Sequence, residues 1–353
     1  MSTRVGPEGP VPTLAFVESP VQLLNTLEWA HHRPPEALTV VVLPPADPMT
    51  RGQLRRMAQL ARDAGHRVRW EEARGGTGPL RTVRGLAPLL RRAPRVVVGD
   101  PFSRYVHLLL TLTRAPELVV VDDGTATMEF VGQLAAGERL VRWHRHGGRP
   151  GPRDLAFAPV TATARRRLLP GPDRTVEVFS ALPLAAVPEG VRTTANDFGW
   201  TRSRFGPPRL SGGADLVGTS LVETGVVDPV RYAAAVRSLA RTHGATRYFA
   251  HRRERPEKLH ALAAATGLEI RRPDLPLELI ARRGPIGRTV LSFPSTVVHT
   301  LPLALAGTGA RVAVCDIDPE WLTAGASPRA RGFLAGVTDT ARDVHRLRSV
   351  CAG

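Results

Sequence analysis

The stretch APELVVVDDGTAT, Ala115–Thr127, ends an apolar run on two adjacent carboxylates and a glycine. The aliphatic residues before Asp122 are typical of a strand that is covered on both faces of a parallel sheet. Asp122, Asp123 and Gly124 would be costly to bury, so they fit the carboxyl end of that strand. Open α/β sheets bind their ligands at this edge. The stretch therefore predicts an α/β fold with a candidate functional site at the two carboxylates.

Strand-like and helix-like segments alternate on both sides of this stretch. In the first part of the chain, strands are predicted at 13–17, 38–43, 96–98, 118–121 and 175–180, with a helix at 52–64. After residue 209, strands are predicted at 214–221, 246–249, 268–271, 288–293 and 311–316, and helices at 229–242, 256–266 and 296–306. This alternation predicts mostly parallel sheets with helices on both faces.

The length of 353 residues allows two domains of ordinary size, each with its own core. Pro, Gly and Arg dominate between Trp143 and Arg209, and we interpret this part as an inter-domain region. Two α/β domains in tandem would leave a cleft between the carboxyl edges of their sheets. Such a cleft is a natural place for a substrate.

The bulk composition predicts a soluble protein of the cytoplasm. Hydrophobic residues make up 42% of the chain, and no apolar run approaches the ~20 residues that span a bilayer. The first residues, MSTRVGPEGPVP, contain Pro and Gly where a signal peptide would be apolar. Cys315 and Cys351 are too few for a disulfide framework or a zinc site and suit a reducing compartment.

The formal net charge is +16, and a positive field attracts nucleic acid, anionic lipid and anionic substrates alike. Nearly all basic residues are arginine, and Lys258 is the only lysine. Aromatic residues make up 5% of the chain, and there is no helix-turn-helix, RNP or zinc-finger signature. A nucleic-acid-binding protein is therefore the less favoured interpretation of the charge.

Two candidate sites lie in the first half of the chain. The sequence ESPVQLL begins a predicted helix, whose free N–H groups can bind an anion or a hydroxyl-rich ligand. Its candidate residues are Glu18, Ser19 and Gln22, and the alternative is a helix N-cap with a first-turn proline. In the DDG sequence, one carboxylate is expected to face the cleft as a base while the other bonds the loop. The alternative is an Asp-Gly turn.

Two more candidate sites lie in the second half. In YFAHRRE, Tyr248–Glu254, His251 directly follows an aromatic strand and can donate a hydrogen bond or a proton to a departing phosphate. The alternative is a structural or solvated histidine. In SFPSTVVHTL, Ser295 and Thr296 open a helix, so two hydroxyls and the first amides converge on one point that can bind phosphate without a metal. The alternative is an ordinary Ser/Thr N-cap.

The ordered set ESPVQLL, DDG, GTSLVE, YFAHRRE and FPSTVV resembles the bacterial polysialyltransferase and lipooligosaccharide sialyltransferase group. Members of that group show a D/E-D/E-G motif, a His-Pro motif and a Ser/Thr-rich motif in this order. The likeness covers most of the chain as short blocks. The resemblance implies a GT-B fold, with a Rossmann-like acceptor domain over 1–205 and a Rossmann-like donor domain over 206–353. The last helix is a candidate for returning to the first domain.

The resemblance also implies metal-independent, inverting transfer from a CMP-sialic acid donor, with no cofactor besides this co-substrate. The family's base falls on Asp122, and the histidine that serves the leaving phosphate falls on His251. The Ser/Thr motif, also on the phosphate, falls on Ser295 and Thr296. Expected supporting residues are Asp123, Gly124 and Glu254, and the residues expected to approach the nucleotide are Gly218, Thr219 and Ser220.

One position departs from the family pattern, because Arg252 stands where the family has proline. This leaves two alternatives open: a GT-B glycosyltransferase that uses another nucleotide sugar, and a catalytically inactive homologue that binds a sugar or a partner. The basic charge fits the sialyltransferase-like interpretation, because a nucleotide sugar, a sialylated acceptor and the inner membrane surface are all anionic. Peripheral contact with that surface is therefore expected.

Overall fold

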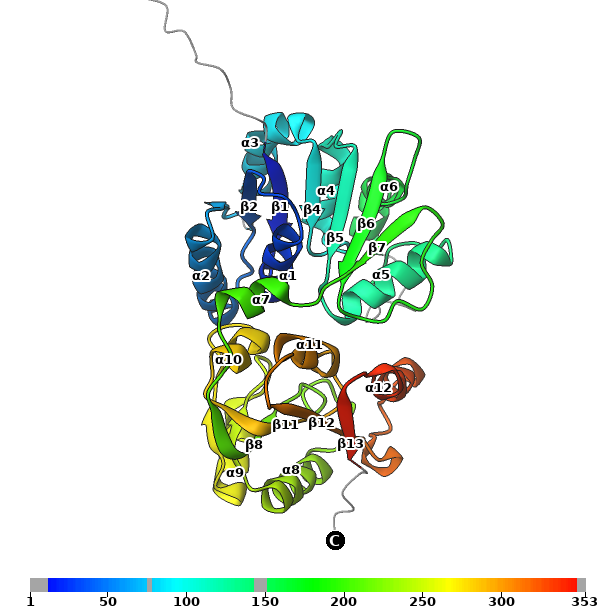
Figure 1. The fold of residues 1–353 in the computed structure, drawn as a ribbon. Coiled ribbons are helices and arrows are strands. Elements are labelled where there is room, and N and C mark those ends of the chain that lie inside the picture. The colour runs from blue at the N-terminus through cyan, green and yellow to red at the C-terminus, as the bar shows by residue number, and fades with distance from the viewer. Residues whose placement is uncertain (1–11, 75–77, 143–150, 348–353) are drawn as a thin grey trace, which may run out of the picture. The chain divides into compact units, whose positions relative to one another are not determined.

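The computed structural model describes residues 12–74, 78–142 and 151–347 (Figure 1). The chain divides into two compact units, Met1–Asn196 and Asp197–Gly353. The division precedes the boundary expected after residue 205, because helix α7 (Gly199–Arg204) packs against helices of the second unit. The start of the chain and Cys351 lie outside the described residues.

The first unit is built on one parallel sheet of seven strands in the order β3-β2-β1-β4-β5-β6-β7. Its strands are β1 (Thr13–Val17), β2 (Leu38–Val42), β3 (Arg67–Trp70), β4 (Arg95–Val98), β5 (Glu117–Val121), β6 (Thr175–Ser180) and β7 (Val191–Ala195). Its helices are α1 (Pro20–His31), α2 (Pro48–Asp63), α3 (Gly78–Arg92), α4 (Arg104–Leu112), α5 (Thr125–Ala135) and α6 (Pro152–Arg167). The strand order reverses between β1 and β4, which is the switch point where Rossmann-type sheets bind ligands.

The second unit repeats this plan with six parallel strands in the order β10-β9-β8-β11-β12-β13. Its strands are β8 (Leu210–Val217), β9 (Ala245–Phe249), β10 (Glu269–Arg271), β11 (Ile286–Ser292), β12 (Arg311–Cys315) and β13 (Val344–Leu347). Besides α7, its helices are α8 (Pro229–His243), α9 (Pro256–Thr266), α10 (Leu277–Arg283), α11 (Val297–Ala304) and α12 (Pro328–Thr340). The switch point lies between β8 and β11. The last helix, α12, buries Leu334 and Val337 in this unit.

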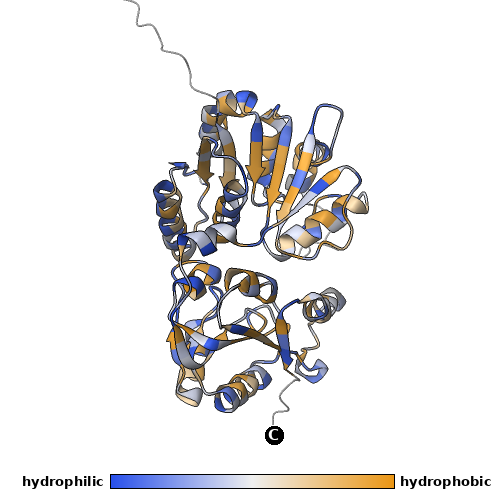
Figure 2. Cartoon of the chain, in the orientation of Figure 1, coloured by the Kyte–Doolittle hydropathy of each residue, from blue (hydrophilic) through white to orange (hydrophobic). Residues whose placement is uncertain are grey.

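The apolar runs form the strands as predicted. Leu118, Val119, Val120 and Val121 of β5 are each at most 1% exposed, which confirms a strand covered on both faces. Figure 2 shows hydrophobic residues concentrated along the strands of each unit. Both units therefore have the Rossmann-like α/β architecture that was expected. Within the described part of the chain, no helix has the length and apolar character needed to cross a membrane.

The interpretation of residues 143–209 as an inter-domain region is wrong for its described part. Helix α6 and strands β6 and β7 belong to the first unit, and β6 and β7 extend its sheet. β6 was predicted as a strand, but the sequence concealed the other two elements. Helix α6 carries arginines and a proline without an apolar stripe, and β7 is a largely exposed edge strand. Residues 143–150 lie outside the described residues.

A buried carboxylate fixes the central strands of the second sheet. Asp215 of β8 is 1% exposed and accepts hydrogen bonds from Arg247 of β9, at 2.8 Å (Nε) and 2.6 Å (Nη2). It also accepts one from the backbone N–H of Gly287 at the start of β11, at 2.6 Å. The pairing register shifts next to both contacts. One side chain thus spans three strands at an irregular point of the sheet.

We expect Asp215→Ala to lower the free energy of unfolding of the second unit by about 3–5 kcal/mol, because it leaves Arg247 and the Gly287 amide without their partner. Urea unfolding followed by tryptophan fluorescence measures this loss. The control is Asp228→Ala, which removes an exposed N-cap of α8 and should cost about 1 kcal/mol. Equal losses in the two variants would contradict the role of Asp215.

Candidate functional site

Asp122 follows β5, but its side chain lies in the interior of the first unit and is 2% exposed. Its Oδ2 accepts hydrogen bonds from Ser180 Oγ at 2.9 Å and from the Ala181 amide at 3.3 Å, both at the end of β6. Its Oδ1 accepts one from the Gly124 amide at 2.9 Å. Burial raises the pKa of Asp122 to about 6, against the opposing effect of these hydrogen bonds. Asp122 therefore joins β5 to β6 and titrates close to neutral pH.

Asp123 is the more accessible carboxylate of the pair, since its side chain is only partly buried. Ser19 Oγ lies 3.5 Å from its Oδ1, and its backbone N–H donates to Thr127 Oγ1 at 2.8 Å. Gly124 makes the turn into α5 with φ of 68° and ψ of −135°, a conformation that suits glycine. The backbone of DDG therefore forms the Asp-Gly turn given as the alternative. The Asp122 side chain is buried against β6, whereas the Asp123 side chain lies near Ser19.

In ESPVQLL, two of the three candidate residues have structural contacts. Ser19 is the N-cap of α1 and accepts from the Gln22 amide at 3.2 Å, and Pro20 starts the helix. The buried side chain of Gln22 accepts the backbone N–H of Glu18 at 2.7 Å. The N-cap alternative therefore describes Ser19 correctly. Of the three candidate residues, Glu18 is the one whose side chain lines a cavity.

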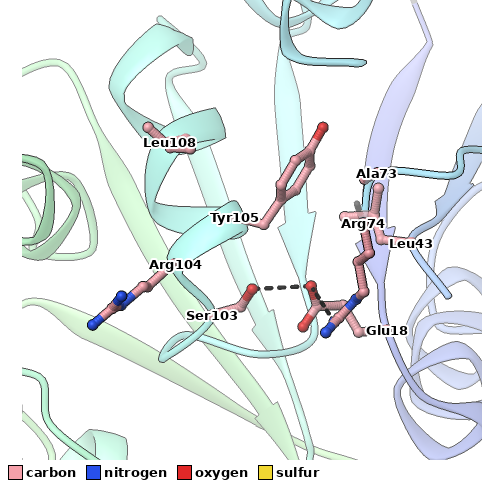
Figure 3. Close-up of a pocket in the computed structure, with 8 residues that line it drawn as sticks. All are labelled: Glu18, Leu43, Ala73, Arg74, Ser103, Arg104, Tyr105 and Leu108. Atoms are coloured by element: carbon pink, nitrogen blue, oxygen red, sulfur yellow. Dashed lines mark hydrogen bonds and ion pairs between the residues drawn. The ribbon is translucent and has the colours of Figure 1, made fainter. Parts of the chain in front are cut away.

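Glu18 lines a cavity of about 310 Å³ at the switch point of the first sheet (Figure 3). Its Oε1 accepts from Ser103 Oγ at 2.9 Å and lies 3.3 Å from the Arg74 guanidinium. Burial, reinforced by the charge of Asp100, raises the pKa of Glu18 to about 7. The cavity is lined by Glu18, Leu43, Ala73, Arg74, Ser103, Arg104, Tyr105 and Leu108.

Sequence reasoning missed Asp100 and Ser103. Asp100 is 4% exposed, accepts the Phe102 amide at 2.9 Å and pairs with Arg142. The signal was present in RVVVGDP, an apolar run that ends on a glycine and a carboxylate as the DDG stretch does. The same rule that located Asp122 would have located Asp100 next to Glu18.

We expect the Glu18 carboxyl to make the first unit less stable as pH rises. Because its pKa is about 7 in the folded state, above the value of 4.5 for an unperturbed glutamate, the folded state holds a proton that the unfolded chain has lost. The stabilising effect of this proton is complete below about pH 4.5 and is lost as pH rises through 7, a change of about 3 kcal/mol. Glu18→Gln removes this dependence.

Thermal unfolding of wild type and Glu18→Gln at pH 5 and pH 8 measures the effect. The variant should lose less stability than wild type between the two pH values and should be the more stable protein at pH 8. Glu138→Gln, at an exposed position, is the matched control and should follow wild type. Parallel curves for wild type and Glu18→Gln would show that Glu18 does not titrate as described.

In the second unit, His251 follows β9 and its ring has a defined tautomer. The backbone N–H of Arg253 donates to His251 Nδ1 at 3.2 Å, so the proton of the neutral ring is on Nε2. Burial, together with the positive charges of Arg252, Arg253 and Lys258, lowers the pKa of His251 to about 4. At neutral pH the ring is therefore an uncharged donor through Nε2–H. Arg252, at the family's proline position, contributes to keeping it uncharged.

The loop that carries His251 is held by a buried network around Glu254. Glu254 Oε2 accepts the backbone N–H of His251 at 2.6 Å, and Oε1 accepts from Tyr248 Oη at 2.6 Å. Tyr248 Oη is 2.7 Å from Tyr232 Oη. A Cβ on Gly218 would lie 2.1 Å from Glu254 Oε2, so only glycine fits there. Glu254 and Gly218 thus support the histidine loop.

Lys258, the only lysine of the chain, neutralises this network. Its Nζ lies 2.8 Å from Glu254 Oε1, 3.3 Å from Glu223 Oε2 and 4.3 Å from the centre of the Tyr232 ring. A compact ammonium group fits between two carboxylates and a ring, whereas the planar fork of arginine needs more room. The other basic residues of the chain are arginines, apart from its histidines. The close packing of the ammonium group between Glu254, Glu223 and the Tyr232 ring explains why position 258 has lysine instead.

We expect Lys258→Met to lower the free energy of unfolding of the second unit by about 1.5–3 kcal/mol, because Glu254 loses its buried cation. Burial already raises the pKa of Glu254, and Lys258 is the largest influence that lowers it. The loss should therefore be smaller at pH 5, where Glu254 can take up a proton, than at pH 8. Thermal unfolding at both pH values measures it. Lys258→Arg keeps the charge but not the fit, so it should lose some stability, though less than Lys258→Met. Equal losses in the two variants would contradict the role of the charge, and an unchanged stability of Lys258→Arg would contradict the steric argument.

Ser295 and Thr296 lie at the start of α11 with both hydroxyls available. Thr296 is the N-cap residue, but its side chain makes no capping hydrogen bond. Within the described residues, no hydrogen bond to either hydroxyl is found, and both side chains are partly buried. The N-cap alternative therefore does not account for these hydroxyls. They remain free to bind a ligand at the first turn of the helix.

The second sheet brings three of the predicted segments to one edge. Gly218, Thr219 and Ser220 follow β8, His251 follows β9, and Ser295 and Thr296 follow β11. These strands are neighbours and parallel, with β8 in the middle, so the segments meet at the carboxyl edge beside the switch point. In the first sheet, Glu18 and the DDG turn share the equivalent edge. Among the described residues, no three His, Cys, Asp or Glu side chains are close enough to bind one metal ion.

No protein-family model matches the sequence, and no curated protein matches it. Solved structures do resemble the chain. An alpha/beta-galactoside alpha-2,3-sialyltransferase from Photobacterium phosphoreum is 9% identical, with a TM-score of 0.51 over 96% of this chain and 99% of that one. An E. coli heptosyltransferase with ADP-2-deoxy-2-fluoro heptose is 13% identical, with a TM-score of 0.43 over 96% and 94%.

A putative UDP-N-acetylglucosamine 2-epimerase from Listeria monocytogenes is 13% identical, with a TM-score of 0.45 over 87% of this chain and 79% of that one. At these identities structural similarity shows the fold alone. Together with the two parallel sheets, the similarity to the Photobacterium structure shows that the chain has a GT-B type fold.

Proposed function

We propose that the protein is a metal-independent, inverting glycosyltransferase that transfers sialic acid or a related acidic sugar from a CMP-activated donor to a glycan acceptor. The observation that carries the proposal is the carboxyl edge of the second sheet. There, a neutral histidine with a fixed Nε2–H and two hydroxyls that no described residue hydrogen-bonds follow the strands on either side of a glycine-containing turn. All three groups are donors, as a leaving phosphate requires.

On the donor side, the bond between the sugar and the phosphate oxygen breaks, and negative charge develops on that oxygen. His251 Nε2–H, Ser295 and Thr296 would donate hydrogen bonds to the phosphate, and the first amides of α11 would add their dipoles. An uncharged imidazole can do this without holding a full positive charge in a cationic environment. Gly218, Thr219 and Ser220 would approach the nucleotide, since the turn after the first strand of a Rossmann-type unit is the usual place for it.

On the acceptor side, a carboxylate must take the proton of the attacking hydroxyl. We assign this role to Asp122, which follows the family resemblance and is supported by its pKa of about 6, a value near the operating pH of a base. Its hydrogen bond from Ser180 would have to yield to the acceptor hydroxyl, because Asp122 has no free oxygen in the resting state. The more accessible Asp123 is the other candidate for the base, against which Asp122 should be compared.

Two measurements test the proposal. Thermal shifts with CMP, UDP and GDP show which nucleotide the folded protein prefers, since a ligand selective for the folded state raises its melting temperature. Incubation with CMP-sialic acid and a panel of glycan acceptors, followed by detection of released CMP, shows transfer. A larger shift with UDP or GDP would favour another nucleotide sugar, and a CMP shift without turnover would favour an inactive homologue. DNA binding with a steep salt dependence and no nucleotide shift would favour the nucleic-acid alternative.

A further inference from the structure

The cavity beside Glu18 is lined by both polar and apolar groups. Glu18 directly follows β1, and Ser103 is the N-cap of α4 in the segment after β4, so both lie beside the switch point of the first sheet. Leu43, Ala73, Leu108 and the ring of Tyr105 provide the apolar surface (Figure 3). A volume of about 310 Å³ lies at the small end of the range for ligand sites and suits a single ring.

One oxygen of Glu18 is available to a ligand. Both contacts of the carboxyl group, from Ser103 Oγ at 2.9 Å and from the Arg74 guanidinium at 3.3 Å, are made to Oε1. No hydrogen bond joins Oε2 to any residue within the described ranges. The backbone of Glu18 is fixed in turn by Gln22 at 2.7 Å. A carboxyl group that is 12% exposed, held at one oxygen and open at the other, is prepared to bind a hydrogen-bond donor.

Arg74 and Arg104 differ in how they line this cavity. In Figure 3 the Arg74 guanidinium points toward Glu18, whereas the Arg104 guanidinium points away, and it pairs with Asp154. Arg74 is 52% exposed, so it can also reach a bound molecule at the mouth of the cavity. A carboxylate, a guanidinium and an aromatic wall together match the two faces of a pyranose ring, whose hydroxyls need polar partners and whose C–H groups pack on apolar surface.

We infer that this cavity binds one sugar ring, with a ring hydroxyl donating a hydrogen bond to Glu18 Oε2 and the C–H face packing on Tyr105 and Leu108. The inference rests on the proposed function only in identifying that ring as part of the glycan acceptor. It also assigns a condition for binding: the ionised form of Glu18 accepts the hydroxyl, because a charge-assisted hydrogen bond is the stronger one.

Of the groups that line this part of the cavity, Glu18 is the one expected to change its protonation state, and therefore to control ligand binding, between pH 6 and pH 8. Charged groups around it are Arg74 in the loop after β3, Asp100 in the loop after β4, and Arg142 after α5. Tyr105 on α4 has its pKa raised to about 12 by burial and keeps its proton in this range. Since burial raises the pKa of Glu18 to about 7, the ionised fraction of Glu18 increases about 10-fold from pH 6 to pH 8. If only the ionised form binds, affinity should rise by about the same factor.

The test is binding of two monosaccharide probes to the full chain, without any nucleotide donor. Methyl β-D-galactopyranoside is the neutral probe and methyl α-sialoside the anionic one, and saturation-transfer NMR with titrations at pH 6 and pH 8 gives their affinities. We expect at least one probe to bind, with an affinity that rises up to about 10-fold at the higher pH. Comparison of the two probes shows whether the cavity prefers a neutral or an acidic sugar at the end of the acceptor.

Three variants connect the binding to this cavity. Glu18→Gln keeps the side-chain shape and should abolish the pH dependence, and Tyr105→Ala should weaken binding at both pH values by removing the wall. Glu138→Gln should behave as wild type. Failure of both probes to bind wild type, or equal pH dependence in Glu18→Gln, would overturn the inference. A CMP shift in the same protein tests the donor side separately, so failure of the cavity and failure of the proposed transferase can be told apart.

Discussion

Replacing His251 by alanine is expected to lower the rate of sugar transfer by about 10²–10³-fold at saturating donor, because it removes one preorganised donor to the developing phosphate charge. The same change should leave the fold of the second unit intact. The Glu254 network holds the loop through the backbone N–H of residue 251, which alanine retains. Steady-state transfer assays with thermal unfolding as a fold check measure both results. His260→Ala, an exposed histidine of α9, is the matched control.

The pH dependence separates two roles for His251. Because burial and nearby cations lower the pKa of the ring to about 4, it is neutral across the range from pH 6 to pH 8, and its contribution should not change there. His251→Gln keeps an N–H donor and should retain more activity than alanine. A wild-type rate that falls above pH 6.5, with no such fall in His251→Gln, would mean that the ring acts as a charged acid and would contradict the neutral-donor role.

Strands with long apolar runs were predictable because burial on both faces leaves a clear pattern. β1 and β6 match their predicted ranges, and the helix α9 does so as well. The strands β3 and β7, with the sequences RVRW and VRTTA, were missed because polar residues occupy half or more of their positions. Sequence pattern therefore identifies the buried centre of each sheet and the edge strand β10, but it misses the edge strands β3, β7 and β13.

The candidate site divides in the same way. Strand-end reasoning proposed His251, Ser295 and Thr296 as candidates, because a polar residue after a buried strand is a local signal. It could not show that Asp122 turns inward, since its partner Ser180 is 58 residues away in the chain. Nor could it show that Glu18 would have a pKa near 7, because this value depends on burial and on Asp100 from another strand. Long-range hydrogen bonds and burial, which sequence pattern does not contain, determine the chemistry of these carboxyl groups.

Substitution of each carboxylate of the DDG turn should affect the rate of transfer differently, and this difference identifies the base. Asp122→Asn is expected to lower the rate of transfer by about 10²–10⁴-fold, because the amide cannot accept a proton. Its side chain can keep the hydrogen bond from Gly124 through the amide oxygen, and the Ser180 hydroxyl can reverse and accept from the new NH2 group, so that of these contacts only the one from the Ala181 amide is lost. Thermal unfolding should therefore show a folded protein. Asp123→Asn, at the accessible position, should keep most of the activity.

The pH profile tests the same assignment without a mutation. With a pKa of about 6, Asp122 must lose its proton before it can act, so kcat at saturating acceptor should rise as pH increases through 6 and level off above 7. Saturation with acceptor removes the pH dependence of binding that is expected from Glu18. A carboxyl group with an ordinary pKa would give a rise near pH 4 instead. If Asp123→Asn is inactive while Asp122→Asn transfers sugar at the wild-type rate, the base is the exposed carboxylate. The buried one would then serve to join β5 to β6, because its hydrogen bonds to Ser180 and Ala181 already perform that function.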